Sequence, residues 1–124
     1  MHKVVVYGSL KRGLYNSRLL DGIECLDDSV YFTGTMASLG SCPCVTQHGN
    51  TKIKGELYEV DDETLARLDQ LEGHPSCYER KRVHTSAGEA WIYFIDDQSY
   101  YGPSARLVKS GVWQENHNYE EQAA

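Results

Sequence analysis

The sequence predicts a single small domain in which several β-strands accompany one main α-helix. Short runs rich in β-branched and aromatic residues recur along the chain between turn residues, as is typical of strands. Residues 61–72 instead carry leucines at helical spacing between capping residues. A chain of 124 residues, 40% of them hydrophobic and 24% charged, has the composition of an ordinary globular domain and can bury a core without disulfides or metals.

The first part of the chain predicts a buried strand and a short helix. Lys3–Tyr7 is apolar after its first residue and stops at Gly8, which indicates a strand that ends in a tight turn. Asn16–Leu20 has a weak helical pattern and is followed by Asp21 and Gly22, which end it.

The middle and the end of the chain predict further strands. Val30–Ser38 is expected to form a strand in which Gly34 weakens the interior and indicates a bulge, and Gly40 and Pro43 then indicate a loop. Lys52–Val60 alternates as a strand does, but the pattern leaves open which face is apolar. Two further runs flank the three-residue turn Ser86-Ala87-Gly88 and predict a hairpin of Arg80–Thr85 and Glu89–Ile95.

The main helix is predicted from both of its ends. Asp61 is a suitable N-cap, and the acidic residues that follow it favour the positive end of the helix dipole. Leu65, Leu68 and Leu71 follow one another at helical spacing and are expected to face the core. Gly73 is a typical C-terminal cap, so the helix should end one residue before it, at Glu72.

Glu72 is the candidate catalytic residue. It stands seven residues after Leu65 and four after Leu68, which places a carboxylate on the face that should pack against the core. Partial burial and the negative end of the helix dipole both raise the pKa of such a group and suit it to general acid/base chemistry. Alternatively, Glu72 rotates outward and pairs with Arg80 or Arg82, and position alone does not decide between the two.

Composition argues against several classes of partner. The formal net charge of −6 disfavours nucleic acid. The longest apolar run, Val4 to Val6, is far shorter than the roughly 20 residues that cross a bilayer. The first residues lead straight into a strand-like run without the pattern of a signal peptide, so we expect a cytoplasmic protein without a membrane partner.

The cysteines do not predict a metal site. Cys42 and Cys44 form one C-x-C unit, whereas Cys25 and Cys77 stand alone, and zinc sites typically use paired C-x2-C units. We therefore expect no metal and reduced thiols. A nucleophilic role for Cys77, three residues after His74, is a weaker alternative, because catalytic Cys and His residues meet in space rather than in sequence.

Several motifs together resemble the γ-glutamylcyclotransferase-like (AIG2-like) family. The segment Tyr7-Gly8-Ser9-Leu10, followed by Lys-Arg-Gly, resembles the family's YGSL or YGTL signature. The helix end LDQLEGHP, residues 68–75, with Tyr78 and Arg80 after it, resembles the second motif. Pro43-Cys44-Val45 and Ser110-Gly111-Val112-Trp113 are further similarities, although relatives often have Asp where Val112 stands.

The resemblance implies an α+β fold, with a small, strongly curved or barrel-like mixed sheet, one main helix and a short one. The similarity spans residues 3 to about 113, so we expect one domain over residues 1–115, and the polar, unpatterned residues 116–124 are expected to form a flexible tail. The resemblance also implies an enzyme without a cofactor that cyclises a small γ-glutamyl substrate to 5-oxoproline and releases an amine or amino acid. The motifs are closest to those of γ-glutamylamine cyclotransferases, and a monomer or weak dimer is expected.

The resemblance also assigns the candidate site residues. Glu72 matches the catalytic acid/base, and Tyr7, Gly8, Ser9 and Leu10 match the loop that binds the glutamyl head group. Tyr78 matches a tyrosine that borders the substrate, although packing at the start of a strand is an equal alternative. Two other classes of function stay open, a non-catalytic module that binds a small γ-glutamyl-like ligand and an interaction domain that uses Tyr100-Tyr101.

Overall fold

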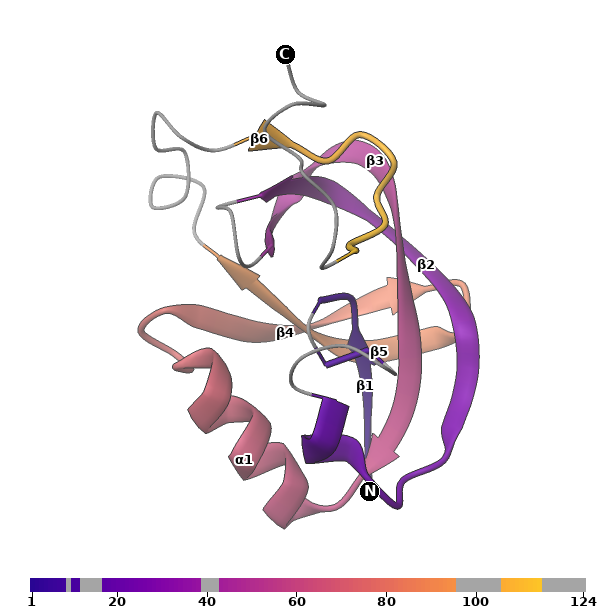
Figure 1. Ribbon diagram of the computed structural model, residues 1–124, viewed down its shortest axis with the longest axis vertical. Helices are drawn as coiled ribbons and strands as arrows, with labels where there is room; N and C mark the ends of the chain where they lie inside the picture. The colour runs from indigo at the N-terminus through magenta and orange to yellow at the C-terminus, as the bar shows by residue number, and fades with distance from the viewer. Residues whose placement is uncertain (9, 12–16, 39–42, 96–105, 115–124) are drawn as a thin grey trace.

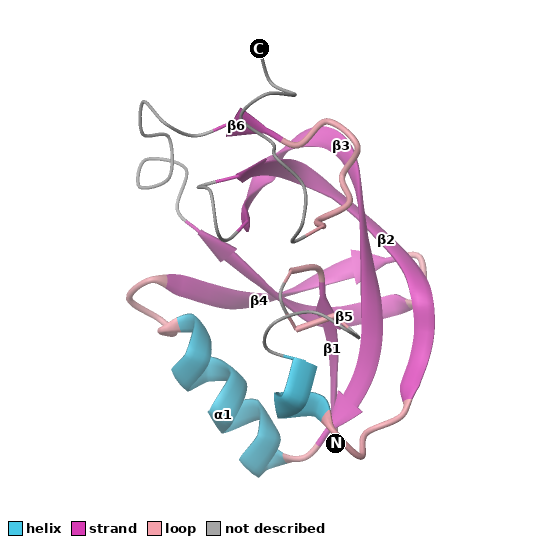
Figure 2. Ribbon diagram, in the orientation of Figure 1, coloured by secondary structure: helices cyan, strands magenta, loops and turns pink. Residues whose placement is uncertain are grey.

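The fold consists of one mixed β-sheet, a main α-helix and a short 3₁₀ helix (Figures 1 and 2). The computed structural model describes residues 1–8, 10–11, 17–38, 43–95 and 106–114. Its elements in chain order are β1 His2–Val6, η1 Ser17–Leu20, β2 Cys25–Ser38, β3 Pro43–Val60, α1 Asp62–Glu72, β4 Tyr78–Thr85, β5 Gly88–Ile95 and β6 Arg106–Leu107. The predicted α+β class is confirmed.

The sheet is strongly curved. Its strand order is β4-β5-β1-β3-β2-β6, in which β1 and β5 run parallel and the other neighbours pair antiparallel. β2 and β3 are long and bend together into a half-barrel (Figure 1). Register shifts interrupt their pairing, one of them between Gly34 and Thr35, and such bulges increase local bending. The pairing is thus irregular next to Gly34, as the glycine indicated, but the residues that the register skips, 47–50, belong to β3.

Strand β1 is buried on both of its faces, which explains why its sequence is a continuous apolar run. Val5 and Tyr7 belong to a core cluster made by the strands and the segment after β6, whereas Val4 and Val6 pack toward the helices. The second cluster combines residues of the sheet with residues of η1 and α1. β3 is likewise buried on both faces near its end, where Leu57 joins the first cluster and Tyr58 the second.

Helix α1 begins and ends as predicted. The Asp61 carboxylate accepts a hydrogen bond from the Thr64 backbone N–H at 2.8 Å, and Gly73 adopts the left-handed conformation with φ of +69°. The backbone N–H of Gly73 donates to the carbonyls of Asp69 and Gln70. These contacts satisfy backbone groups that helix ends leave unpaired.

The prediction that Leu71 faces the core is wrong, because its side chain is 42% exposed. At about 100° per residue, Leu71 lies about 120° around the helix from Leu65, whereas Glu72 lies only about 20° from it. The helix therefore turns Glu72, rather than Leu71, toward the side that Leu65 and Leu68 bury.

Several strands begin at other residues than predicted, because pairing with a neighbouring strand determines where they start. The loop expected around Pro43 ends earlier than predicted, because β3 already begins at Pro43 and its residues 43–46 pair with β2. β2 similarly starts at Cys25 rather than Val30. The β4–β5 turn has two residues instead of three, since Gly88 already pairs with Thr85. The short helix is a 3₁₀ helix, and Asn16 lies outside the described residues.

Candidate active site

The first group of predicted site residues follows β1. Tyr7 and Leu10 are buried, and the Gly8 carbonyl accepts a hydrogen bond from the Lys11 backbone N–H at 3.0 Å, which closes a tight turn. A Cβ atom at Gly8 would lie 2.8 Å from Cγ of Pro43, so a side chain at this position would meet the proline ring. Ser9, the fourth predicted member, lies outside the described residues.

Pro43 connects this turn with the second motif. The Tyr78 hydroxyl donates a hydrogen bond to the Pro43 carbonyl at 2.6 Å, and the half-buried Tyr78 ring packs against Cys44 and its neighbour Ala37. Gly8 and Tyr78, which are 70 positions apart in the numbering, thus contact the same residue. This contact accounts for Tyr78 as a packing residue, and its role beside a substrate stays a prediction.

Glu72 is half-buried at the end of α1, and burial raises the pKa of its carboxyl to about 7. Within the described part of the chain, the carboxyl makes no hydrogen bond or ion pair. The alternative in which it pairs with an arginine of β4 is wrong. Arg80 pairs with Asp69 at 2.8 Å, and the guanidinium groups of both Arg80 and Arg82 lie over the Trp91 ring.

Tyr93 of β5 makes hydrogen bonds to both motifs, to Tyr7 of the first and to Asp69 of the second. Its backbone carbonyl accepts a hydrogen bond from the Tyr7 hydroxyl at 2.6 Å, and its own hydroxyl donates to Oδ1 of Asp69 at 2.6 Å. Burial, Asp69 and the nearby charge of Glu72 all raise the pKa of Tyr93. One buried tyrosine therefore contacts the first motif and lies within electrostatic reach of the candidate acid.

Neither Asp69 nor Tyr93 stands out in the sequence as a candidate site residue. The available signal was the spacing of Asp69, which stands three residues before Glu72 and so lies on a neighbouring part of the same helix face. Tyr93 carried no comparable signal, because an aromatic residue in a strand is ordinary packing.

A separate surface pocket of about 250 Å³ lies beside the turn. Its wall includes polar groups of both charges, contributed by Lys11, Asp28, Ser29, Lys54, Gly55, Glu56 and Val112. Lys11 donates to the Trp113 carbonyl at 2.7 Å, and burial lowers the pKa of its ammonium group. Val112, where the family resemblance led us to expect Asp, lines this pocket.

The described residues offer no metal site, since no group of three His, Cys, Asp or Glu side chains within them could hold an ion. Three cysteines are free thiols, of which Cys25 is half-buried, Cys44 buried and Cys77 exposed. Cys42, Tyr100 and Tyr101 lie outside the described residues, as does the predicted tail. No helix in the described ranges is long and apolar enough to cross a membrane.

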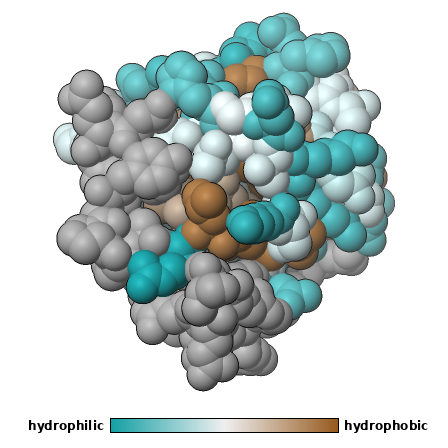
Figure 3. All heavy atoms as spheres, turned by 90° about the horizontal axis from the view of Figure 1, so that it is seen from above, coloured by the Kyte–Doolittle hydropathy of each residue, from teal (hydrophilic) through white to brown (hydrophobic). Residues whose placement is uncertain are grey.

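One face of the molecular surface is partly apolar. Seen from above, apolar side chains gather near the middle of the face and polar ones surround part of them (Figure 3). Tyr7 and Leu10 of the first motif and Leu68 of the second are buried. The described chain thus combines a half-barrel sheet, a tight turn after β1 and a half-buried acid at the end of α1.

The chain belongs to the family described as "Gamma-glutamyl cyclotransferase, AIG2-like", which matches residues 4–115. It is 34% identical over 113 residues to the γ-glutamylcyclotransferase family protein YtfP of Escherichia coli, a match that covers 90% of this chain and 95% of that protein. A γ-glutamylaminecyclotransferase of Bos taurus is 35% identical over 96 residues, covering 67% of this chain and 55% of the bovine protein.

Solved structures with a similar fold support the family assignment. A crystal structure of an uncharacterized protein from Pyrococcus horikoshii superposes with a TM-score of 0.73 at 28% sequence identity, and the match covers 90% of this chain and 89% of that one. The curved sheet implied by the family resemblance is therefore shown both by the structure and by its neighbours.

Proposed function

We propose that the protein cyclises the γ-glutamyl group of a small γ-glutamyl compound to 5-oxoproline and releases an amine or amino acid. The observation that carries this proposal is Glu72, a half-buried carboxyl whose pKa burial raises to about 7 at the end of α1. Near neutral pH such a group exists in both protonation states, so it can accept a proton and return it.

The reaction needs one proton shuttle and no external nucleophile. The α-amine of the substrate attacks its own γ-carbonyl carbon, which forms the ring C–N bond, and the bond to the leaving nitrogen then breaks. The ionised Glu72 accepts the proton that the amine loses and delivers it to the leaving nitrogen. Because nucleophile and carbonyl belong to one molecule, the enzyme's main task is to hold the reactive conformer.

The turn after β1 is the proposed binding site for the glutamyl head group and the developing oxyanion. Backbone N–H groups stabilise such charges when they point at them without interference from a Cβ atom. Gly8 supports this assignment, since its backbone lies too close to Pro43 for a side chain. Tyr7, Ser9 and Leu10 complete the proposed loop, and Tyr78 is proposed to border the substrate beside it.

The proposed substrates are γ-glutamyl amines or simple γ-glutamyl amino acids. The name of the bovine relative supports an amine as the leaving group. The reaction calls for no cofactor, because it changes no oxidation state and uses a carbonyl already present in the substrate. The free α-amine is essential, since it is the attacking group.

The test measures 5-oxoproline release from γ-glutamyl-ε-lysine, γ-glutamyl-alanine and glutathione, each with its N-acetylated counterpart as a blank. We expect turnover of the first two and none of the blanks. Glu72→Gln should reduce kcat about 10²- to 10⁴-fold because it removes the titrating site and preserves the shape. Glu63→Gln, an exposed change on the same helix, is the control and should keep full activity.

The possible results distinguish the mechanism, the leaving group and the non-catalytic alternative. Wild-type activity in a folded Glu72→Gln variant would refute the mechanism. A strong preference for glutathione refutes the small leaving group and leaves the role of Glu72 intact. Binding of the compounds without any release of 5-oxoproline would favour the non-catalytic module.

A further inference from the structure

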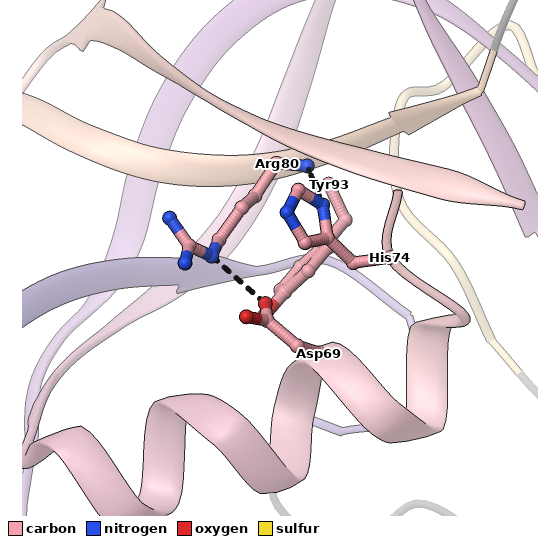
Figure 4. A network of polar contacts seen from close by, with 4 residues as sticks. All are labelled: Asp69, His74, Arg80 and Tyr93. Carbon is pink, nitrogen blue, oxygen red and sulfur yellow. Dashed lines mark hydrogen bonds and ion pairs between the residues drawn. The ribbon is translucent and has the colours of Figure 1, made fainter. Parts of the chain in front are cut away.

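Asp69 is the centre of a polar network between α1 and the sheet. Figure 4 shows the Arg80 and Tyr93 side chains reaching the carboxylate of Asp69, with His74 beside them. Both hydrogen bonds end on the same oxygen, Oδ1, with distances of 2.8 Å from Nε of Arg80 and 2.6 Å from the Tyr93 hydroxyl. Partial burial opposes the charge of Asp69, but these two donors keep its pKa below the usual value.

The partners of Asp69 are themselves held in place. The guanidinium carbon of Arg80 lies 4.4 Å from the centre of the Trp91 ring, a cation–π contact that adds to its ion pair with Asp69. Tyr93 is buried, and its backbone carbonyl accepts the hydrogen bond from the Tyr7 hydroxyl. The network therefore extends from α1 to the residue that begins the first motif.

The chain just after Glu72 is tied to the same network. The His74 backbone N–H donates to the Asp69 carbonyl at 2.9 Å, which closes the end of the helix. Nδ1 of His74 in turn accepts a hydrogen bond from the Arg80 backbone N–H at 3.2 Å. Glu72 thus lies between two segments, the turn at Asp69 and the turn at His74, that both bind to β4.

The exposed ion pair between Glu63 and Arg67, on the same helix, serves as a comparison for the Asp69–Arg80 pair. Glu63 and Arg67 pair at 2.7 Å, but their side chains are 72% and 60% exposed and touch no other element through this pair. Asp69 and Arg80 are only 20% and 21% exposed and join two elements. Exposed pairs of the first kind contribute little, whereas partly buried ones restrict geometry.

We propose that Asp69 is a positioning residue, which through Tyr93 and Arg80 fixes the end of α1, and with it Glu72, relative to Tyr7 and the turn that follows. This inference rests on the proposed function for its effect on catalysis. A proton shuttle must lie within hydrogen-bond reach of the substrate nitrogens, and an error of about 1 Å in such geometry can cost about 10²-fold in rate. The network supplies the rigidity that Glu72, without a hydrogen-bond partner in the described chain, does not obtain for itself.

Three variants separate geometry from charge. Asp69→Ala removes both hydrogen bonds and should lower kcat about 10²-fold. Asp69→Asn keeps an oxygen that can accept both bonds and should retain kcat within a few-fold. Tyr93→Phe removes the hydrogen bond from Tyr93 to Asp69 but keeps the buried ring and the Asp69–Arg80 pair. It should lower kcat by less than Asp69→Ala does. Glu63→Gln, the exposed change, should leave kcat unchanged.

The decisive measurement does not depend on turnover. An NMR titration of the Glu72 carboxyl carbon gives its pKa in each variant, with Glu72→Gln used to assign the signal. If the end of α1 detaches from the sheet, water reaches Glu72, and its pKa moves from about 7 toward the ordinary 4.5. We expect this move in Asp69→Ala, a smaller one in Tyr93→Phe, and none in Asp69→Asn or Glu63→Gln.

The results distinguish this inference from the proposed function. A folded Asp69→Ala variant with the wild-type pKa at Glu72 and wild-type kcat overturns the positioning role, whatever its melting temperature. Equal losses in Asp69→Asn and Asp69→Ala would also overturn it, because charge rather than hydrogen-bond geometry would then matter. If Asp69→Ala does not fold, wild-type values in Tyr93→Phe overturn it instead. A wild-type protein without activity refutes the proposed function, while the titration still decides the positioning role.

Discussion

Removal of the Glu72 carboxyl should stabilise the protein at alkaline pH and not at acid pH. The unfolded chain ionises Glu72 near its ordinary pKa of 4.5, whereas the folded chain does so near 7. Between these values the folded state binds more protons than the unfolded state, so the contribution of Glu72 to stability falls as pH rises through this window. Above it, the folded protein contains a carboxylate in surroundings that disfavour charge.

The magnitude follows from the two pKa values. Each pH unit between them corresponds to about 1.4 kcal/mol, so raising the pKa from 4.5 to about 7 costs about 3 kcal/mol at pH 8. Glu72→Gln has nearly the same shape and no titrating group. The difference in unfolding free energy between the variant and the wild type should therefore grow by about 3 kcal/mol in favour of the variant between pH 4 and pH 8.

Urea denaturation of both proteins at several pH values checks this expectation, provided that the m-values agree. Other titrating groups are common to the two proteins and cancel in the comparison. A constant difference between the variant and the wild type across this pH range would refute the reasoning, because it would mean that burial does not perturb Glu72. Together with loss of turnover, the expected result would show an acid that is retained at a cost in stability.

Two further predictions concern the scaffold and the chemistry. Gly111→Ala should destabilise the protein by about 1–3 kcal/mol more than Gly22→Ala, measured by urea denaturation. Both glycines have positive φ, of +72° and +80°, but an added Cβ meets the Lys52 carbonyl oxygen at 2.0 Å only at Gly111, so equal losses would contradict the close-contact argument. EDTA should leave 5-oxoproline release unchanged, because the proposed reaction uses no metal; a loss of activity that zinc restores would contradict this.

The local elements of the fold could be predicted from the sequence because their causes are local. Asp61 and Gly73 determine the ends of α1 through hydrogen bonds to residues within one turn. The helical period alone directs Glu72 to the same side as Leu65, and the structure finds it half-buried there. The apolar run before Gly8 likewise predicts a buried strand and the turn after it. The position of the candidate acid was therefore visible as a local pattern, whereas the head-group role of the turn after β1 came from the family resemblance.

Contacts between distant segments were decided by the tertiary structure. Pro43 indicates a loop, yet residues 43–46 form a strand because they pair with residues 35–38 of β2. The meeting of Gly8 and Tyr78 at Pro43 depends on the curvature of the sheet, which no local pattern expresses. The network of Asp69, Arg80 and Tyr93 requires α1, β4 and β5 to be in contact, and strand order is a property of the whole chain. The sequence by itself determined which residues carry the proposed chemistry, whereas only the packing of the sheet against α1 decided what holds them in place.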